Sequence, residues 1–270
     1  MDINKDMQEY IDYYNHEKRR IPVNIAKYKK EVDVAEKELQ TAIAAGDKRL
    51  IYGYSDILKQ NKRDLSYYEE MSSFLREPNE DDIRYREHQE DNFPKKIKQM
   101  LSDDMAFCFH GTGIVGAKNI LLSGEISSGA DRTGHATSFD PPGRISVTNK
   151  DTVDTSVGIY MGMNGSGYCY PAGCLFVLLP QSKAEYDALS GSGWMIKNVN
   201  FKENSDRLVA VVTTPENIER VQGWAKKGGV DVSKVMDFDA FVLKYSSQND
   251  KGLSLVVKKN VAAKRFDKSQ

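Results

Sequence analysis

The stretch that decides the fold is Ala106-Phe107-Cys108-Phe109-His110-Gly111-Thr112, followed closely by Ala117-Lys118-Asn119-Ile120-Leu121-Leu122-Ser123-Gly124. The first is an apolar run that ends in a polar tripeptide, which is typical of a strand that delivers polar groups to a cleft. The second has the apolar spacing of a short amphipathic helix that stops at a glycine. A histidine and a small hydroxyl beside a glycine suit recognition of a planar polar molecule, because the glycine lets a ligand approach the backbone.

The first hundred residues have the pattern of a helical hairpin. In residues 24–45 apolar side chains recur every third or fourth position, and after Gly46-Asp47 the same spacing continues through residues 48–75. Two such segments joined by a short break are expected to pack antiparallel. The second segment ends at Glu77-Pro78-Asn79-Glu80, and the highly charged residues 81–92 are expected to form a solvated helix or a connector.

From about Met105 the sequence changes to short apolar runs separated by glycine, proline, serine and asparagine. Such runs predict strands. The predicted strands are 107–109, 144–148, 174–179, 208–212, 235–238, 241–243 and 253–257, and the predicted helices are 116–123, 152–161, 183–189 and 215–227. Strands with few helices between them favour an α+β domain over residues 101–270, preceded by a helical region over residues 1–100.

Two local details of this second half can be predicted from residue chemistry. Thr214 is expected to cap the helix over 215–227, with Pro215 in its first position. Asp237 and Asp239 flank Phe238 and are expected on the solvent side of a strand, because successive side chains of a strand point to opposite faces.

Composition excludes several classes of function. A formal net charge of −1 gives no electrostatic case for binding nucleic acid or an anionic membrane. The three cysteines, Cys108, Cys169 and Cys174, form neither an even set nor a metal-ligand spacing, so we expect reduced thiols and no metal site. No apolar run approaches the ~20 residues that span a bilayer, and the N-terminus has no signal-peptide core. We therefore expect a monomer made in the cytoplasm, which a secretion system that needs no cleavable signal could export.

The motif Phe109-His110-Gly111-Thr112, with a helix after it that ends in Leu122-Ser123-Gly124, resembles the first motif of the ADP-ribosyltransferase fold. It is similar in particular to the histidine-bearing branch shared by diphtheria-type toxins and poly-ADP-ribose polymerases. The resemblance implies a mixed, split β-sheet and a site for NAD, in which His110, Gly111 and Thr112 hold the adenine ribose and the nicotinamide. Without the resemblance, His-Gly-Thr is three common residues, and the histidine could be purely structural.

A second motif of that fold is a strand with small hydroxyl side chains, or a tyrosine that stacks on nicotinamide. Ser146 and Thr148 alternate along a predicted strand and therefore share one face. Tyr160 and Tyr170 compete for the stacking role. An aromatic ring on a flat cationic ring gains roughly 0.5 to 2 kcal/mol. Each tyrosine could equally pack in the core.

The third motif implied by the resemblance is an acidic group near the nicotinamide ribose. Such a group accepts a hydrogen bond from the 2′-hydroxyl and stabilises the positive charge that develops as the glycosidic bond breaks. Asp206 stands immediately before the predicted strand 208–212, and Glu203 lies one short step back. The usual glutamate is missing, so either carboxylate could be the base or charge stabiliser, and both could instead be exposed residues at a strand entrance.

A narrower resemblance is to bacterial effectors that are injected into host cells and ADP-ribosylate ubiquitin on a threonine. They carry a cysteine, histidine, tyrosine, proline and serine pattern, which this chain offers as Cys108, His110, Tyr170, Pro171 and Ser205. The resemblance implies a mono-ADP-ribosyltransferase that uses NAD on a protein substrate in the host cytosol, with catalytic residues among His110, Tyr170, Glu203, Ser205 and Asp206.

Two other functions stay open. The chain could be a non-catalytic module that only holds a partner protein, which the missing glutamate favours. It could also be similar to RNA 2′-phosphotransferases, although such an enzyme needs a strongly basic cleft and residues 105–220 contain no clustered Arg-Lys patch. The hairpin is expected to grip the target or brace the domain, and Tyr52 and Tyr67, which fall off its apolar stripe, are its interface candidates.

Overall fold

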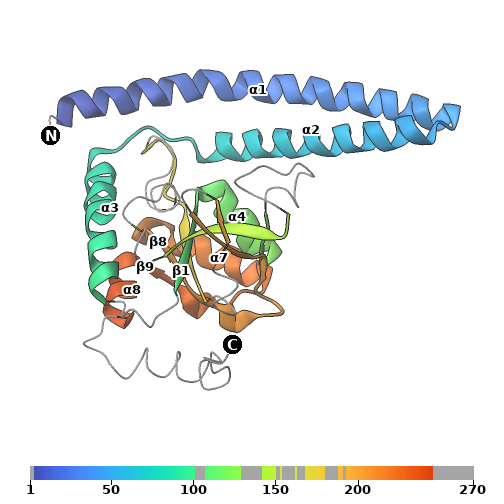
Figure 1. Ribbon diagram of the computed structural model, residues 1–270. Helices are drawn as coiled ribbons and strands as arrows, with labels where there is room; N and C mark the ends of the chain where they lie inside the picture. Colours follow the sequence, from blue (N-terminus) through green and yellow to red (C-terminus); the bar gives the residue numbers. More distant parts are fainter. Residues whose placement is uncertain are drawn as a thin grey trace, which may run out of the picture. The chain divides into compact units, whose positions relative to one another are not determined.

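The structure is a computed structural model, and it describes residues 3–100, 107–128, 142–149, 153, 162, 168–179, 188–190 and 193–245 (Figure 1). The chain divides into two compact units. The first is Met1–Asn79 with Gly167–Pro171, and the second is Glu80–Ser166 with Ala172–Gln270. The second unit contains a mixed sheet, so the predicted α+β class with N-terminal helices is confirmed.

The first unit is an antiparallel helical hairpin of α1 (Ile3–Ala45) and α2 (Lys48–Phe74), which run side by side in Figure 1. Gly46 turns the chain with a φ of 69°, and Asp47 caps α2 by accepting hydrogen bonds from the backbone N–H groups of Arg49 and Leu50. The predicted hairpin is confirmed, but α1 begins at Ile3 and not at residue 24. The apolar spacing does not predict the helix before residue 24, because one of the buried positions there is a carboxylate, Glu17.

A short segment from later in the chain belongs to the first unit. We call residues 168–171 the strap. Tyr168 adopts a φ of 57°, and its ring centroid lies 4.6 Å from that of Tyr10 in α1. The Cys169 carbonyl accepts a hydrogen bond of 2.8 Å from the backbone N–H of Arg76, just after α2.

The helix α3 (Glu80–Met100) belongs to the second unit, so the boundary lies before α3 and not at residue 100. The prediction that residues 81–92 are solvated is wrong for one face of this helix, on which Ile83 and Arg86 are buried. Burial of the Arg86 guanidinium is possible because it is paired. It donates to Asp82 at 2.6 and 2.9 Å and to Glu216 at 3.2 Å.

Within the described residues, the second unit contains a seven-stranded sheet in the order β5-β6-β3-β1-β4-β8-β9. Only β8 and β9 are parallel, and every other neighbouring pair is antiparallel. The bounds are β1 Cys108–Thr112, β3 Arg144–Asn149, β4 Cys174–Leu178, β5 Ala188–Ser190, β6 Gly193–Lys197, β8 Leu208–Thr213 and β9 Val235–Asp237. A separate pair is formed by β2 (Glu125–Ile126) and β7 (Val199–Asn200).

Strand β3 changes partner along its length. Residues 144–147 pair with β6, whereas Thr148 and Asn149 pair with Phe109 and Cys108 of β1. In the described part of the chain, β1 therefore pairs with β3 only at its first two residues. Beyond Phe109, no residue pair joins the described parts of these two strands.

Helices cover both faces of this sheet. The helices α4 (Ile114–Ser123) and α7 (Ile218–Gly228) lie on one face, and α3 and α8 (Phe238–Tyr245) lie on the other (Figure 1). Each face has its own apolar core. The backbones of α4 and α7 approach closely at Gly228, where a Cβ atom would lie 1.7 Å from the Leu121 carbonyl oxygen.

Two predictions about the chain around β9 and α8 are corrected. Residues 241–243 form part of α8 and not a strand, because Phe238, Phe241 and Tyr245 bury one helical face. Asp237 ends β9 and accepts a hydrogen bond from the backbone N–H of Ala240, so Asp237 and Asp239 do not flank a strand residue.

The helix predicted over 215–227 is divided. It begins as a 3-10 turn, Pro215–Asn217, and continues as α7. Pro215 takes the first position as predicted, but Thr214 makes no side-chain capping bond to the backbone. Residues 188–189 of the helix predicted over 183–189 lie in strand β5, and the rest of it lies outside the described residues, as do the strand predicted over 253–257 and all of 152–161 except Val153.

Two glycines near the end of α7 give a matched pair of expected stability changes. Gly223 is exposed inside the helix and a Cβ there meets nothing within 4 Å, so Gly223→Ala should raise the free energy of unfolding by about 0.5 to 1 kcal/mol. Gly229 follows the helix with a φ of 75°, so Gly229→Ala should lower it by about 1 to 2 kcal/mol. Urea unfolding at pH 7 measures both free energies. Two changes of the same sign would contradict the left-handed backbone conformation of Gly229 after α7.

Candidate functional site

His110 lies in the middle of β1, directly after the residues that pair with β3. Its side chain is partly exposed, and its ring centroid lies 6.5 Å from that of Phe176 in β4. The imidazole Nδ1 lies 2.9 Å from the carbonyl oxygen of Ser146 in β3. A carbonyl oxygen only accepts, so Nδ1 carries the proton and donates. In the neutral ring Nε2 is then the nitrogen that can accept a hydrogen bond.

Gly111 and Thr112 continue β1 beyond this pairing. On one side they pair with Leu175 and Cys174 of β4. On the other side, the described part of β3 supplies no partner for them. A strand edge of this kind presents N–H and C=O groups in a row, which is the pattern that a planar amide can match.

The backbone around this edge is closely packed by glycines. At Gly173, just before β4, a Cβ atom would lie 1.8 Å from the Thr112 carbonyl oxygen. At Gly116, in the first turn of α4, it would lie 2.1 Å from the Thr112 hydroxyl. The Thr112 side chain is therefore packed against α4, and the strand edge is fixed between β4 and the start of that helix.

Ser146 and Thr148 share a face of β3 as predicted, but it is not the face of His110. Thr148 lies opposite Phe109, whose side chain belongs to the core under α3 and α8. His110 lies opposite Phe176, which belongs to the core under α4 and α7. The carbonyl of Ser146, and not its hydroxyl, is the group that meets His110.

Cys108 is fully buried, and its thiol lies 3.6 Å from the Leu178 carbonyl oxygen. A thiol enclosed in this way fills the core and offers nothing to a ligand. Tyr160, the first candidate for stacking on nicotinamide, lies outside the described residues.

Tyr170, the second stacking candidate, is a strap residue of the first unit. Its side chain is only 2% exposed, and its hydroxyl donates a hydrogen bond of 2.8 Å to the Glu17 carboxylate of α1. A ring buried to this degree has no face for a ligand, so the structure does not support a stacking role. Pro171, which follows it, is also buried.

The Glu17 carboxylate is the centre of a buried polar cluster. Arg20 donates two hydrogen bonds of 2.7 Å to it and lies near the hydroxyl of Tyr68. Burial alone would raise the pKa of Glu17, but the hydrogen bonds from Arg20 and Tyr170 outweigh burial and lower it. Burial and the negative Glu17 raise the pKa of Tyr170, so Tyr170 stays a neutral donor.

The candidate carboxylates lie on the exposed segment 203–206. Ser205 and Asp206 form a 3-10 turn (Ser205–Arg207) that leads into β8, and Lys234 donates to the Ser205 carbonyl oxygen. Leu208, at the start of β8, lies opposite Leu178 of β4, and Leu178 lies opposite Cys108, the first residue of β1. Thr112, the last residue of β1, lies opposite Cys174, at the other end of β4. About 16 Å of strand separates the two ends of β8. The structure therefore does not bring Asp206 and Ser205 to the Gly111–Thr112 edge.

Glu203 has a different relation to the motif. The Phe201 ring stacks on Phe176, with centroids 6.0 Å apart and an interplanar angle of 16°, and Phe176 is the strand partner of His110. Glu203 follows Phe201 by two residues, and its backbone N–H is held by the Asn200 side chain. The Glu203 side chain is exposed.

Two contributors to the site were not predicted. Phe176 supports both His110 and Phe201, and Gly173 permits the contact with Thr112. Gly173 carries a sequence signal, because a glycine directly before an all-apolar strand often marks a close backbone approach. Phe176 carries none, since it is one of several apolar residues in its run.

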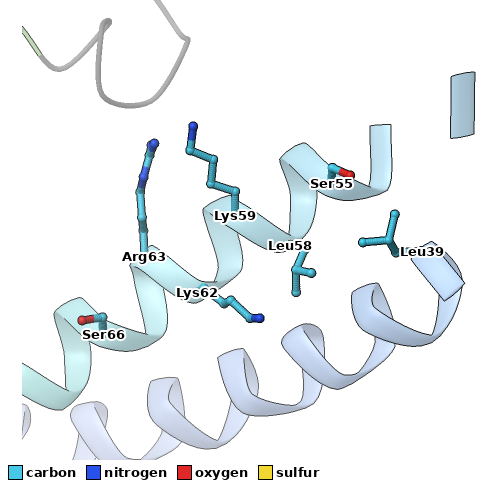
Figure 2. Close-up of a pocket in the computed structure, with 7 residues that line it drawn as sticks. All are labelled: Leu39, Ser55, Leu58, Lys59, Lys62, Arg63 and Ser66. Atoms are coloured by element: carbon cyan, nitrogen blue, oxygen red, sulfur yellow. The ribbon is translucent and has the colours of Figure 1, made fainter. Parts of the chain in front are cut away.

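The first unit has a hollow of about 520 Å³ between its helices, lined by α1 residue Leu39 and by α2 residues that include Leu58, Lys59, Lys62 and Arg63. Figure 2 shows Lys59 and Arg63 pointing away from α1. Lys62 pairs with Glu36 of α1 at 2.8 Å. The hollow is thus a groove at a helix–helix contact, with its cations directed to a salt bridge or to solvent.

Comparison with protein-family models, with curated proteins and with solved structures found no match. Among the described residues, no group of three or more His, Cys, Asp or Glu side chains is placed to hold a metal ion. No described helix is long and apolar enough to cross a membrane.

Proposed function

We propose that the second unit is an NAD-dependent mono-ADP-ribosyltransferase that modifies a protein side chain. The observation that carries this proposal is the position of His110. Its imidazole is oriented by the Ser146 carbonyl, and it stands beside a strand edge, Gly111 and Thr112, that β3 leaves unpaired in the described part of the sheet.

This edge has the hydrogen-bonding groups that an NAD molecule needs. The backbone of Gly111 can pair with the carboxamide of nicotinamide, as a neighbouring strand would. The Nε2 atom of His110 can accept a hydrogen bond from a ribose hydroxyl, because Nδ1 is committed as a donor. The first turn of α4 starts at Gly113 without a side-chain cap, so its N–H groups suit a phosphate.

For the charge-stabilising group we favour Glu203 over Asp206. Glu203 follows Phe201, which is stacked on the strand partner of His110, whereas Asp206 lies at the other end of the sheet from Thr112. A carboxylate stabilises the cationic ribose that forms as nicotinamide leaves. It can also accept the proton of a serine or threonine hydroxyl, which is a weak nucleophile at neutral pH.

The narrower proposal is that the acceptor is a threonine of ubiquitin and that the chain is a bacterial effector acting in a host cell. It rests on the sequence pattern, of which His110 is the member with a site geometry to support it. Cys108 would then contribute to the core of the second unit and Tyr170 and Pro171 to the first unit, since all three are buried.

The test is incubation of the full chain with NAD that carries a label on its adenylate, with purified ubiquitin or a cell extract as acceptor. We expect release of nicotinamide and a labelled protein band, and mass spectrometry of that band identifies the modified residue. A label on ubiquitin supports the narrower proposal, and a label on another protein supports only the broader one. The absence of both nicotinamide release and a labelled band would contradict the enzymatic function.

A non-catalytic binding module is the second candidate, and one observation favours it. The carboxylates at 203–206 are exposed, and Ser205 and Asp206 do not converge on the strand edge. Calorimetry with NAD separates the two functions. A module that holds only a protein partner would neither bind NAD nor release nicotinamide.

A further inference from the structure

The strap contacts the helical hairpin and is followed in the chain by β4, the strand that pairs with β1 of the candidate site. Three of its residues contact the first unit. Tyr170 donates to Glu17, Tyr168 packs on Tyr10, and Cys169 accepts from the backbone of Arg76. The partners of these three contacts are Glu17 and Tyr10 of α1, and Arg76, which follows α2. The strap is therefore anchored at each of its first three residues.

The residues directly after the strap are held within the second unit. The Ala172 carbonyl oxygen accepts a hydrogen bond of 3.1 Å from the buried side chain of Asn217, and the Gly173 carbonyl oxygen accepts one of 2.9 Å from Thr213. Gly173 lies against the backbone of Thr112, and the next residue, Cys174, is the strand partner of Thr112. Three peptide bonds separate the hydroxyl-bearing Tyr170 from the contact that supports the NAD-binding edge.

We propose that Glu17 and Tyr170 are positioning residues, through which the helical hairpin sets the backbone of Gly173 and with it the strand edge at Gly111 and Thr112. The proposal rests on the proposed function for its consequence, since the edge is the one assigned to NAD. That the hairpin keeps the backbone of β4 and β1 ordered does not depend on NAD, and we infer it only from the contacts described above.

The bond between Glu17 and Tyr170 can act in this way because both side chains are buried and the partner is charged. Removing one member of a buried, charge-assisted hydrogen bond leaves the other without compensation for its lost hydration. Tyr168 in the strap already has a positive φ, which is unfavourable for a non-glycine residue. Without the anchor at Tyr170, the strap is expected to relax toward ordinary backbone conformations and to release Gly173.

The test is amide hydrogen exchange of the full chain followed by mass spectrometry, without any ligand. Tyr170→Phe keeps the ring and removes only the hydroxyl. We expect exchange of the peptides that cover 168–178 and 108–113 to become at least tenfold faster, as the loss of a buried bond to a charged group predicts. Exchange in α7 is the internal reference and should stay unchanged, because its amide hydrogens are bonded within the helix.

Matched variants keep this result interpretable. Tyr52→Phe removes the hydroxyl of a tyrosine of the same hairpin that is 73% exposed, and it should leave the exchange of these peptides unchanged. Glu17→Gln should accelerate the same peptides as Tyr170→Phe, and the double variant should add little to either single variant because the two residues share one interaction. Faster exchange confined to the hairpin and strap, with 108–113 unchanged, would overturn the proposal.

Nicotinamide release then separates failure of the positioning role of Tyr170 from failure of the proposed function. If the wild-type chain cleaves NAD, Tyr170→Phe should raise KM for NAD at least fivefold with a smaller change in kcat, because the edge that binds NAD is disordered while His110 keeps its chemistry. If the wild-type chain does not cleave NAD, the proposed function fails, and the exchange experiment still decides the positioning role. A purely structural role of Tyr170 would lower kcat and the amount of folded protein together and leave KM unchanged.

Discussion

Replacing His110 by alanine is expected to lower the rate of nicotinamide release at least a hundredfold. The imidazole would be the group that meets a ribose hydroxyl as the glycosidic bond breaks. Removing one oriented hydrogen-bonding group from a developing charge typically costs about 3 to 4 kcal/mol of transition-state stabilisation, which corresponds to a factor of 10² to 10³ in rate. The stability of the chain should change little, because the ring is partly exposed.

His110→Asn makes this prediction sharper. An asparagine amide can donate to the Ser146 carbonyl as Nδ1 does, but it has no counterpart of Nε2. It should therefore preserve the contact between β1 and β3 and still lose the activity. His88→Ala, at an exposed histidine of α3, is the control and should keep the full rate. A His110→Ala chain that releases nicotinamide at the wild-type rate would remove His110 from the site.

Replacing Gly173 by alanine should have the largest effect on stability, lowering the free energy of unfolding of the second unit by more than about 4 kcal/mol. The added Cβ would lie 1.8 Å from the Thr112 carbonyl oxygen and 2.8 Å from two backbone atoms of Gly113. Backbone cannot rotate away as a flexible side chain can, so β1 and β4 would have to separate in the centre of the sheet.

Gly113→Ala is the matched control for this substitution. Gly113 lies on the other side of the same contact, but a Cβ there meets nothing within 4 Å and its φ of −66° is ordinary for alanine. Its expected cost is below about 1 kcal/mol. Urea unfolding followed by tryptophan fluorescence reports on the second unit, which contains both tryptophans, Trp194 in β6 and Trp224 in α7. Equal midpoints for the two variants would contradict the close contact at Gly173.

The elements predicted well from the sequence are those with one clear period. The hairpin follows from apolar residues at three and four spacing, and β1, β4 and β8 follow from apolar runs bounded by turn residues. The helix α3 was misjudged because Arg86 occupies a buried position that the pattern reserves for apolar residues. The run at 241–243 was too short to distinguish a strand from a turn of buried helix.

The candidate site was predictable where it is local and not where it depends on the tertiary fold. His110, Gly111 and Thr112 lie together because they are consecutive in one strand. The contact of the Ser146 carbonyl with His110 could not be predicted, since every residue has a backbone carbonyl whatever its side chain. The resemblance assigns Tyr170 to the ligand, whereas its partner Glu17 lies in a part of α1 that the apolar spacing does not predict.

The strap also has a consequence for the order in which the chain folds. Glu17 and Tyr170 are separated by 153 residues, so the N-terminal hairpin leaves the ribosome long before its last segment is made. At about 5 to 20 residues per second, the wait is roughly 8 to 30 seconds. During that time the Glu17 carboxylate lacks its hydrogen bond from Tyr170, and Tyr10 lacks its ring contact with Tyr168. The hairpin is therefore completed only after the strap has been synthesised, long after the hairpin's own helices.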